Sequence, residues 1–91
     1  MNKSEFVERV AEATGQSRSL SGEMVDAVFA AITSSLKAGE PVNIVGFGNF
    51  VVKRREARMG RNPKTGEPAP IAASNQASFK PGKSLKDTIN S

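Results

Sequence analysis

Residues 46–66 read GFGNFVVKRREARMGRNPKTG, and the character of the chain changes within this stretch. It opens with a glycine-bearing turn between two short apolar runs at 42–44 and 50–52, a pattern typical of two strands joined in a hairpin. It then supplies six Lys or Arg residues within twelve positions, whereas Met59 is the only large apolar residue between positions 56 and 69. Because such a segment cannot bury itself in a core, the stretch predicts a sheet that continues into an exposed basic arm.

We expect this arm to span residues 57–73. Within it, residues 62–66 are typical of a tight turn, because Pro63 fixes its own φ and the closing glycine can take a positive φ. The residues on either side of the turn can pair as a two-stranded ribbon. Pro68 and Pro70 cannot donate hydrogen bonds to a ladder, so we expect the returning strand to pair poorly and the free arm to be mobile.

Two amphipathic segments precede the sheet. Residues 3–14 and 18–38 carry apolar residues at the three- and four-residue spacing of a helix. Asn2 and Glu5 lie three residues apart and predict an N-terminal cap with its reciprocal partner, and Ser17 can cap the second segment. These two segments therefore predict a helical hairpin with one apolar face.

The end of the chain returns to regular structure, with a third strand expected at 74–80 and a short helix at 83–89. The predicted fold class is α+β: an N-terminal helical hairpin, a three-stranded antiparallel sheet with a protruding β-ribbon arm, and a short C-terminal helix. We expect one domain over residues 1–91, made of a helical dimerisation part at 1–40, a sheet at 41–56 and 74–80, the arm at 57–73 and a C-terminal helix at 81–91.

The size of the body predicts an obligate dimer. Without the arm about 74 residues remain, which is marginal for a single core, and the long second helix has an apolar stripe wider than the other elements can cover. The alternative to a dimer is a small monomer with a few exposed apolar residues. For the Phe side chains, the alternative to a place in the core is a platform on which nucleic-acid bases stack. The dimer core is expected to contain Phe29, Ile32, Leu36, Ile44, Phe47, Phe50 and Phe79.

The composition excludes several functions. The chain has no Cys, His, Trp or Tyr, so it lacks the parts of a usual zinc site, a disulfide framework, a thiol nucleophile or an imidazole base. We therefore expect no enzyme activity, no metal, no cofactor and no small-molecule substrate. The longest apolar run, residues 27–32, is far too short for a membrane span or a signal peptide, and we expect a cytoplasmic protein.

The net charge of +4 is divided unevenly along the chain. Acidic residues are in excess over residues 1–40, whereas residues 41–91 hold nine Lys and Arg against three acidic residues. This asymmetry indicates a polyanionic partner, with a merely solvated charged surface as the alternative. A thin basic ribbon can follow a phosphate backbone and enter a DNA groove, and Pro63 at its tip could wedge between base pairs.

The stretch 46–66 resembles the signature of the bacterial HU/IHF family of histone-like DNA-bending proteins. The resemblance also covers residues 1–5 and 79–87, and thus essentially the whole chain. It implies an intertwined dimer whose two arms wrap the DNA minor groove, each tip proline intercalating between base pairs. It rests on anchors at the family spacing: Gly46, Phe47, Phe50, Arg55, Arg58, Gly60, Asn62, Pro63 and Thr65.

The resemblance also implies which side chains contact DNA. Pro63 would be the intercalating wedge, and Asn75 is doubtful as a phosphate contact because residues 75–77 depart from the Lys-Val-Pro of many members. The implied DNA-binding residues are Lys3, Lys53, Arg55, Arg58, Arg61, Asn62, Pro63, Lys64, Lys80, Lys83 and Lys86.

The expected function is that of a nucleoid-associated protein that binds, bends, wraps and stabilises double-stranded DNA with little sequence preference, favouring bent, nicked or distorted DNA. We expect a homodimer, with a heterodimer with a paralogue left open. The length and homodimer-compatible sequence favour the HU type over a sequence-preferring IHF-type factor. A module whose basic arm docks on an acidic protein is the alternative from another class.

Overall fold

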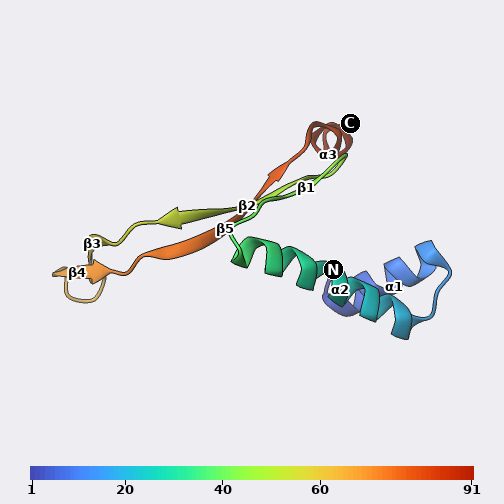
Figure 1. Cartoon of the computed structure of the whole chain (residues 1–91), viewed down its shortest axis with the longest axis horizontal. Helices are drawn as coiled ribbons and strands as arrows, with labels where there is room; N and C mark the ends of the chain where they lie inside the picture. The colour runs from blue at the N-terminus through green and yellow to red at the C-terminus, as the bar shows by residue number, and fades with distance from the viewer. The chain divides into compact units, whose positions relative to one another are not determined.

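The computed structural model describes all residues, 1–91, and the chain divides into two compact units, Met1–Ser34 and Ser35–Ser91. Figure 1 shows the elements in chain order. None of the helices combines the length and apolar character that a bilayer crossing requires. The helices are α1 (Lys3–Thr14), α2 (Arg18–Lys37) and α3 (Lys83–Ile89), and the strands are β1 (Val42–Ile44), β2 (Gly48–Arg55), β3 (Arg58–Arg61), β4 (Pro68–Ile71) and β5 (Ser74–Pro81).

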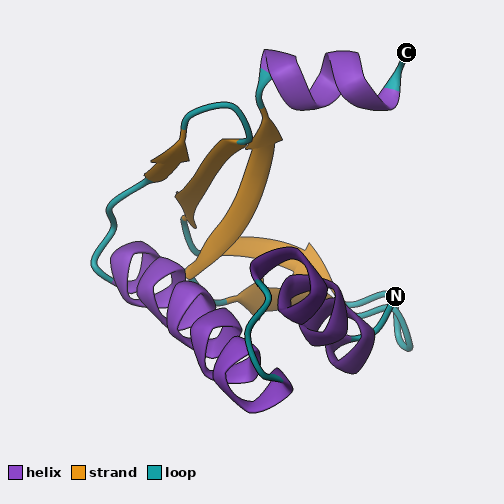
Figure 2. Ribbon diagram, turned by 90° about the vertical axis from the view of Figure 1, so that its right-hand side faces the viewer, coloured by secondary structure: helices purple, strands orange, loops and turns teal.

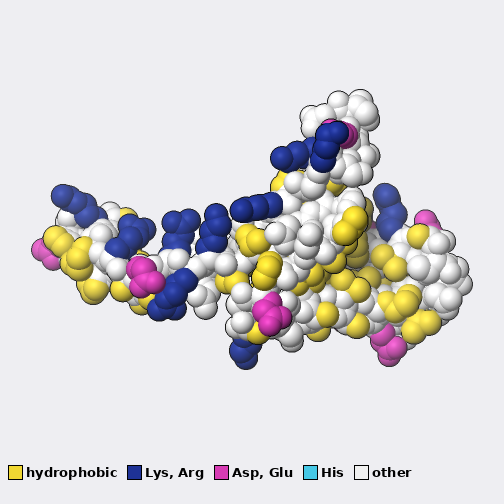
Figure 3. All heavy atoms as spheres, turned by 45° about the horizontal axis from the view of Figure 1, so that its top comes forward, with side chains coloured by type: hydrophobic (Ala, Val, Ile, Leu, Met, Phe, Trp, Pro, Cys, Tyr) yellow, Lys and Arg dark blue, Asp and Glu magenta, His cyan; other side chains and the backbone are white.

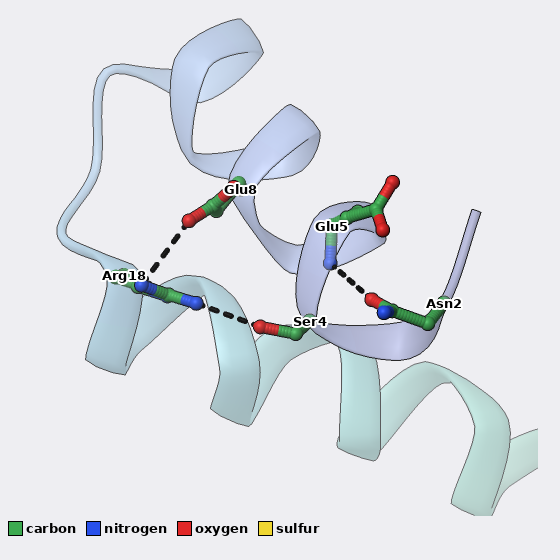
Figure 4. A network of polar contacts seen from close by, with 5 residues as sticks. All are labelled: Asn2, Ser4, Glu5, Glu8 and Arg18. Atoms are coloured by element: carbon green, nitrogen blue, oxygen red, sulfur yellow. Dashed lines mark hydrogen bonds and ion pairs between the residues drawn. The ribbon is translucent and has the colours of Figure 1, made fainter.

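Helix α1 begins at the predicted cap. Asn2 Oδ1 accepts a hydrogen bond of 2.9 Å from the Glu5 backbone N–H, and Figure 4 shows this bond. The expected reciprocal bond is absent, because the Glu5 carboxylate points away from Asn2 into solvent. The helix ends at Gly15, which adopts a φ of 70° and donates its N–H to the Ala11 carbonyl at 2.9 Å.

Helices α1 and α2 form the predicted hairpin. Ser17 Oγ accepts from the Leu20 N–H at 3.1 Å and so caps α2. Arg18 then ties the helices together, because its guanidinium lies 3.1 Å from the Glu8 carboxylate and donates to Ser4 Oγ at 2.7 Å (Figure 4).

Small residues of α2 lie close to α1 inside this hairpin. Ser21 is fully buried, and a Cβ placed at Gly22 would lie 3.9 Å from Val7 Cγ1. Val7 and Val25 are the only buried hydrophobic residues of the whole chain. A single chain therefore buries very little apolar surface of its own.

The second unit is built on an antiparallel sheet with the strand order β1-β2-β5 (Figure 2). The β1–β2 turn closes with a 3.0 Å hydrogen bond from the Phe47 N–H to the Ile44 carbonyl, and Gly46 supplies the positive φ of 84° that a type II turn requires. Gly48 lies after the turn, at the start of β2, and has a different role. A Cβ there would lie 2.5 Å from the Phe79 ring and 2.7 Å from the Lys80 carbonyl oxygen, so Gly48 allows β5 to approach closely.

The arm continues the β2–β5 hairpin in the same register. Arg55 pairs with Ser74, and Arg58 pairs with Ile71. Two residues on each strand, at positions 56–57 and 72–73, lie between these pairs and interrupt the ladder. Strands β3 and β4 then pair over four residues each, so the predicted ribbon is present.

The expectation that Pro68 and Pro70 would disturb this pairing was wrong. They lie opposite Arg61 and Met59 in a regular register. Paired residues of an antiparallel ladder alternate between hydrogen-bonded and non-hydrogen-bonded sites. The Asn62 N–H donates to the Glu67 carbonyl at 2.8 Å, which makes Asn62 and Glu67 a hydrogen-bonded pair. The pairs Arg61–Pro68 and Met59–Pro70 are therefore non-hydrogen-bonded. Both prolines occupy such sites, where the missing N–H would have pointed away from the partner strand.

The aromatic residues of the second unit form one cluster on the sheet. The Phe79 ring lies 4.9 Å from the Phe50 ring and 5.3 Å from the Phe47 ring, measured between centroids. Phe47 and Phe79 nevertheless remain 45% and 38% exposed. In fact none of the seven residues expected in the dimer core is buried within the chain: Phe29, Ile32, Leu36, Ile44, Phe47, Phe50 and Phe79.

Candidate nucleic-acid interface

The sheet formed by β2 and β5 has two chemically different faces. Directly paired residues share a face, and alternate residues along each strand point to opposite faces. Phe50 pairs with Phe79 on one face. Lys53 pairs with Gln76 on the other, which also carries Arg55 and Lys80. We call these the aromatic face and the basic face.

The alternation separates three consecutive basic residues. Lys53 and Arg55 lie on the basic face, whereas Arg54 lies on the aromatic face opposite Asn75. The guanidinium of Arg54 is 3.3 Å from the Glu56 carboxylate, so its charge is compensated within the chain. Asn75 is directed away from the basic face, which adds a geometric reason to the doubt about it as a phosphate contact.

Most of the other cations of this unit have no acidic partner. Of the nine Lys and Arg residues after position 40, only Arg54 and Lys83 lie within ion-pair distance of an acid, and Lys83 is 3.7 Å from Asp87 one helical turn away. Figure 3 shows most of the Lys and Arg side chains of the arm along one side of the ribbon. The residues without an acidic partner are Lys53, Arg55, Arg58, Arg61, Lys64, Lys80 and Lys86.

These unpaired cations line the exposed elements of the second unit. Residues 53–58 surround an open hollow at the interruption where the arm begins. Arg58 and Arg61 follow on β3, and Lys64 lies in the tip. A row of exposed positive charges without counterions in the chain is suited to a polyanion that runs along it.

The arm ends in a turn that is held by several hydrogen bonds. Asn62 Oδ1 accepts from the Lys64 N–H at 2.9 Å, and the Asn62 carbonyl accepts from the Gly66 N–H at 2.7 Å. Gly66 has the predicted positive φ, at 74°. Pro63 directly follows Asn62, whose side chain and backbone both accept hydrogen bonds within the turn. Pro63 itself is exposed at the end of the ribbon.

The remaining predicted contacts lie outside the ribbon. Lys80 is at the end of the basic face, and Lys83 and Lys86 belong to α3. Lys3 lies in the helical unit, where its ammonium is 2.7 Å from the Asp26 carboxylate. The structure thus brings together the predicted contacts of the second unit along β2, the arm, β5 and α3, and it pairs Lys3 with an acid.

One residue of the basic face was missed by the sequence analysis. Gln76 Oε1 accepts a 2.7 Å hydrogen bond from Arg55 Nε. The two residues are 21 positions apart, so only the β2–β5 register reveals their contact. Strict alternation along 48–55 could, however, have separated Arg54 from its two basic neighbours.

Comparisons with known proteins agree with this geometry. The family model described as bacterial DNA-binding protein matches residues 1–90. The DNA-binding protein HU of Xylella fastidiosa is 55% identical over 91 residues, covering 100% of this chain and 97% of the relative, and HU-beta of Escherichia coli is 48% identical over 90 residues, covering 99% and 100%.

Solved structures show the same fold. A structure described as an Anabaena HU–DNA cocrystal has a TM-score of 0.90 and 36% identity, and covers 98% of this chain and 97% of that one. HU from Thermotoga maritima has a TM-score of 0.69 and 31% identity, and covers 98% of each chain.

A long two-stranded ribbon with uncompensated cations, carried by a small α+β body, is typical of an architectural nucleic-acid-binding protein. The chain belongs to the bacterial DNA-binding protein family, and its relatives place it with the HU type within that family.

Proposed function

We propose that this chain is a histone-like, nucleoid-associated protein that, as a homodimer, binds double-stranded DNA through the minor groove and bends, wraps and stabilises it with little sequence preference. The observation that carries the proposal is the arm, a ribbon with no core of its own, lined by cations without acidic partners and ending at Pro63. This role requires no bond-making chemistry, and it places the protein on the bacterial chromosome in the cytoplasm.

The charge of the arm supports binding to the DNA backbone. Each Lys or Arg that neutralises a phosphate releases condensed counterions, so binding is strong at low salt and independent of sequence. Arginine side chains on a thin ribbon also suit the minor groove, where the negative potential is concentrated. We assign this contact to Arg58 and Arg61 on the arm, with Lys64 at its tip, and assign phosphate contacts along the flank to the lysines of β5 and α3 and to Lys3.

The rigidity of the tip supports a wedge. Pro63 has a fixed φ, and the Asn62 bonds to the backbone N–H groups of Lys64 and Gly66 restrict the turn around it. An apolar, rigid group inserted between base pairs unstacks them and kinks the duplex. We infer that Pro63 intercalates and that Asn62 both shapes the tip and contacts the groove.

The unburied apolar residues support the dimer. Phe29, Ile44 and Phe47 are 44–50% exposed in the single chain, and burial of such side chains is the main favourable term in association. A second copy related by a two-fold axis would cover them and would present two arms to the same duplex.

Two other functions give different results in one experiment. A sequence-preferring IHF-type factor would favour one defined site over random DNA by about a thousandfold or more, and an acidic-protein docking module would bind no DNA at low salt. A gel-shift series on intact, nicked and sequence-randomised duplexes separates them. We expect similar affinity for unrelated intact sequences and tighter binding to nicked DNA, and failure to shift any duplex would refute the proposal.

A further inference from the structure

Two neighbouring arginines of β2 use the same atom to bind partners of different charge. Arg54 Nε lies 3.3 Å from the carboxylate of Glu56, whereas Arg55 Nε donates at 2.7 Å to the amide oxygen of Gln76. Arg54 is on the aromatic face and Arg55 is on the basic face. The carboxylate compensates the charge of one guanidinium, while the amide orients the other and leaves its full charge available.

The bond to Gln76 uses Arg55 Nε and leaves the two terminal NH₂ groups of the guanidinium free. A guanidinium has five N–H donors, and Nε provides only one of them. The two terminal NH₂ groups of Arg55 have no acidic partner, and the residue as a whole is exposed. They form the fork that binds two phosphate oxygens at once. The amide nitrogen of Gln76 is also without a partner in the chain and adds a neutral donor beside this fork.

An orienting bond of this kind acts mainly on binding. Both side chains are exposed, so water competes for the bond and it contributes little to folding stability. Association, in contrast, must immobilise a long flexible side chain, and a side chain that is already oriented loses less entropy in the complex. The Arg55–Gln76 bond is therefore expected to increase DNA affinity more than folding stability.

We propose that Gln76 is a positioning residue for DNA binding: it holds the Arg55 guanidinium on the basic face with its terminal NH₂ groups presented to phosphate oxygens. The inference rests on the proposed function, since it assigns Gln76 a role in that same interface. Gln76 lies directly opposite Lys53 in the register and accepts from Arg55, so it neighbours two of the three cations of this face.

A double-mutant cycle on the full chain tests this role. The dissociation constants of wild type, R55A, Q76V and R55A/Q76V for a 20–30 base-pair random duplex, an order-of-magnitude length suited to one dimer, are measured by fluorescence anisotropy. We expect Q76V to weaken binding by about threefold to tenfold in the wild-type background, and by less than about twofold when Arg55 is already absent.

Salt dependence provides a second readout, which separates the loss of a charge from the loss of an orienting bond. R55A removes one charge from each chain of the dimer and should reduce the log–log slope by about 1.8, whereas Q76V removes no charge and should leave the slope unchanged. N75V is the matched control, because Asn75 is adjacent on β5 but lies on the aromatic face. Thermal melting of each variant verifies that the fold is intact.

The outcomes separate this inference from the proposed function. If wild type binds and Q76V weakens binding equally with and without Arg55, the effects are additive and the positioning role is overturned. An effect of N75V as large as that of Q76V would overturn it as well. If the wild-type protein itself fails to bind the duplex, the proposed function fails, independently of any result with the variants.

Discussion

The two faces of the β2–β5 sheet differ in what they lack: the aromatic face is not covered by other apolar residues, and the basic face has no acidic residues beside its cations. On the aromatic face Phe50 and Phe79 pack ring against ring, yet Phe79 is still 38% exposed. On the basic face Lys53 and Arg55 have no acid near them. A large exposed apolar surface is typical of a protein–protein interface, whereas uncompensated positive charge is typical of a site that binds a polyanion. We therefore propose that one sheet serves assembly through one face and DNA binding through the other.

The largest expected effect concerns the aromatic face. Phe79→Ala removes the ring that contacts both Phe47 and Phe50, and we expect it to destabilise the assembled protein by about 3–5 kcal/mol. Chemical denaturation at several protein concentrations measures this loss. Val45→Ser is the control, because Val45 is 95% exposed and belongs to no cluster. Equal stability of Phe79→Ala and wild type would show that this face does not belong to a core.

The next effect concerns the cations of the arm. We expect the triple variant R58A/R61A/K64A to weaken DNA binding by about a hundredfold or more at moderate salt. It should lower the log–log salt slope by about 5.4, because three phosphate neutralisations are lost from each of the two arms of the dimer. Its melting temperature should be unchanged, since these side chains stabilise no core. Wild-type affinity in this variant would mean that the arm does not contact DNA.

A smaller effect is expected from the tip. Pro63→Ala removes the wedge but no charge, so circularisation of short DNA should fall by about tenfold while the dissociation constant changes by less than about threefold. Ligation of a duplex shorter than the persistence length measures the first quantity, and a gel shift measures the second. Unaltered circularisation would remove Pro63 from the bending mechanism.

The smallest effect is the difference in salt slope between substitutions of two adjacent arginines that lie on opposite faces. Arg55→Ala should reduce the salt slope by about 1.8, since the dimer carries two copies of the residue, and it should lower affinity on unrelated sequences alike. Arg54→Ala should leave the slope nearly unchanged, because Glu56 already compensates that charge on the other face. Identical slopes for the two variants would contradict the separation of the faces.

Local signals in the sequence were sufficient for most of the fold. The Asn2 and Ser17 caps, the positive φ at Gly66 and the change from helical to strand periodicity depend on neighbours within a few residues, and the structure confirms them. The recognised signature also identified the family, which the comparisons confirm.

Features that depend on the pairing of distant strands could not be predicted in the same way. The close approach of Phe79 to Gly48 and the bond from Arg55 to Gln76 exist only in one register. Whether Pro70 disturbs a ladder likewise depends on the hydrogen-bonding phase of β3 and β4, which a single strand does not reveal.

The salt dependence of DNA affinity tests the central claim most directly. If one dimer engages about eight phosphates, the logarithm of the association constant for a random duplex should fall against the logarithm of salt concentration with a slope of about −7. A slope near zero would contradict the account, because the unpaired cations of the basic face and arm would then not be neutralising a phosphate backbone.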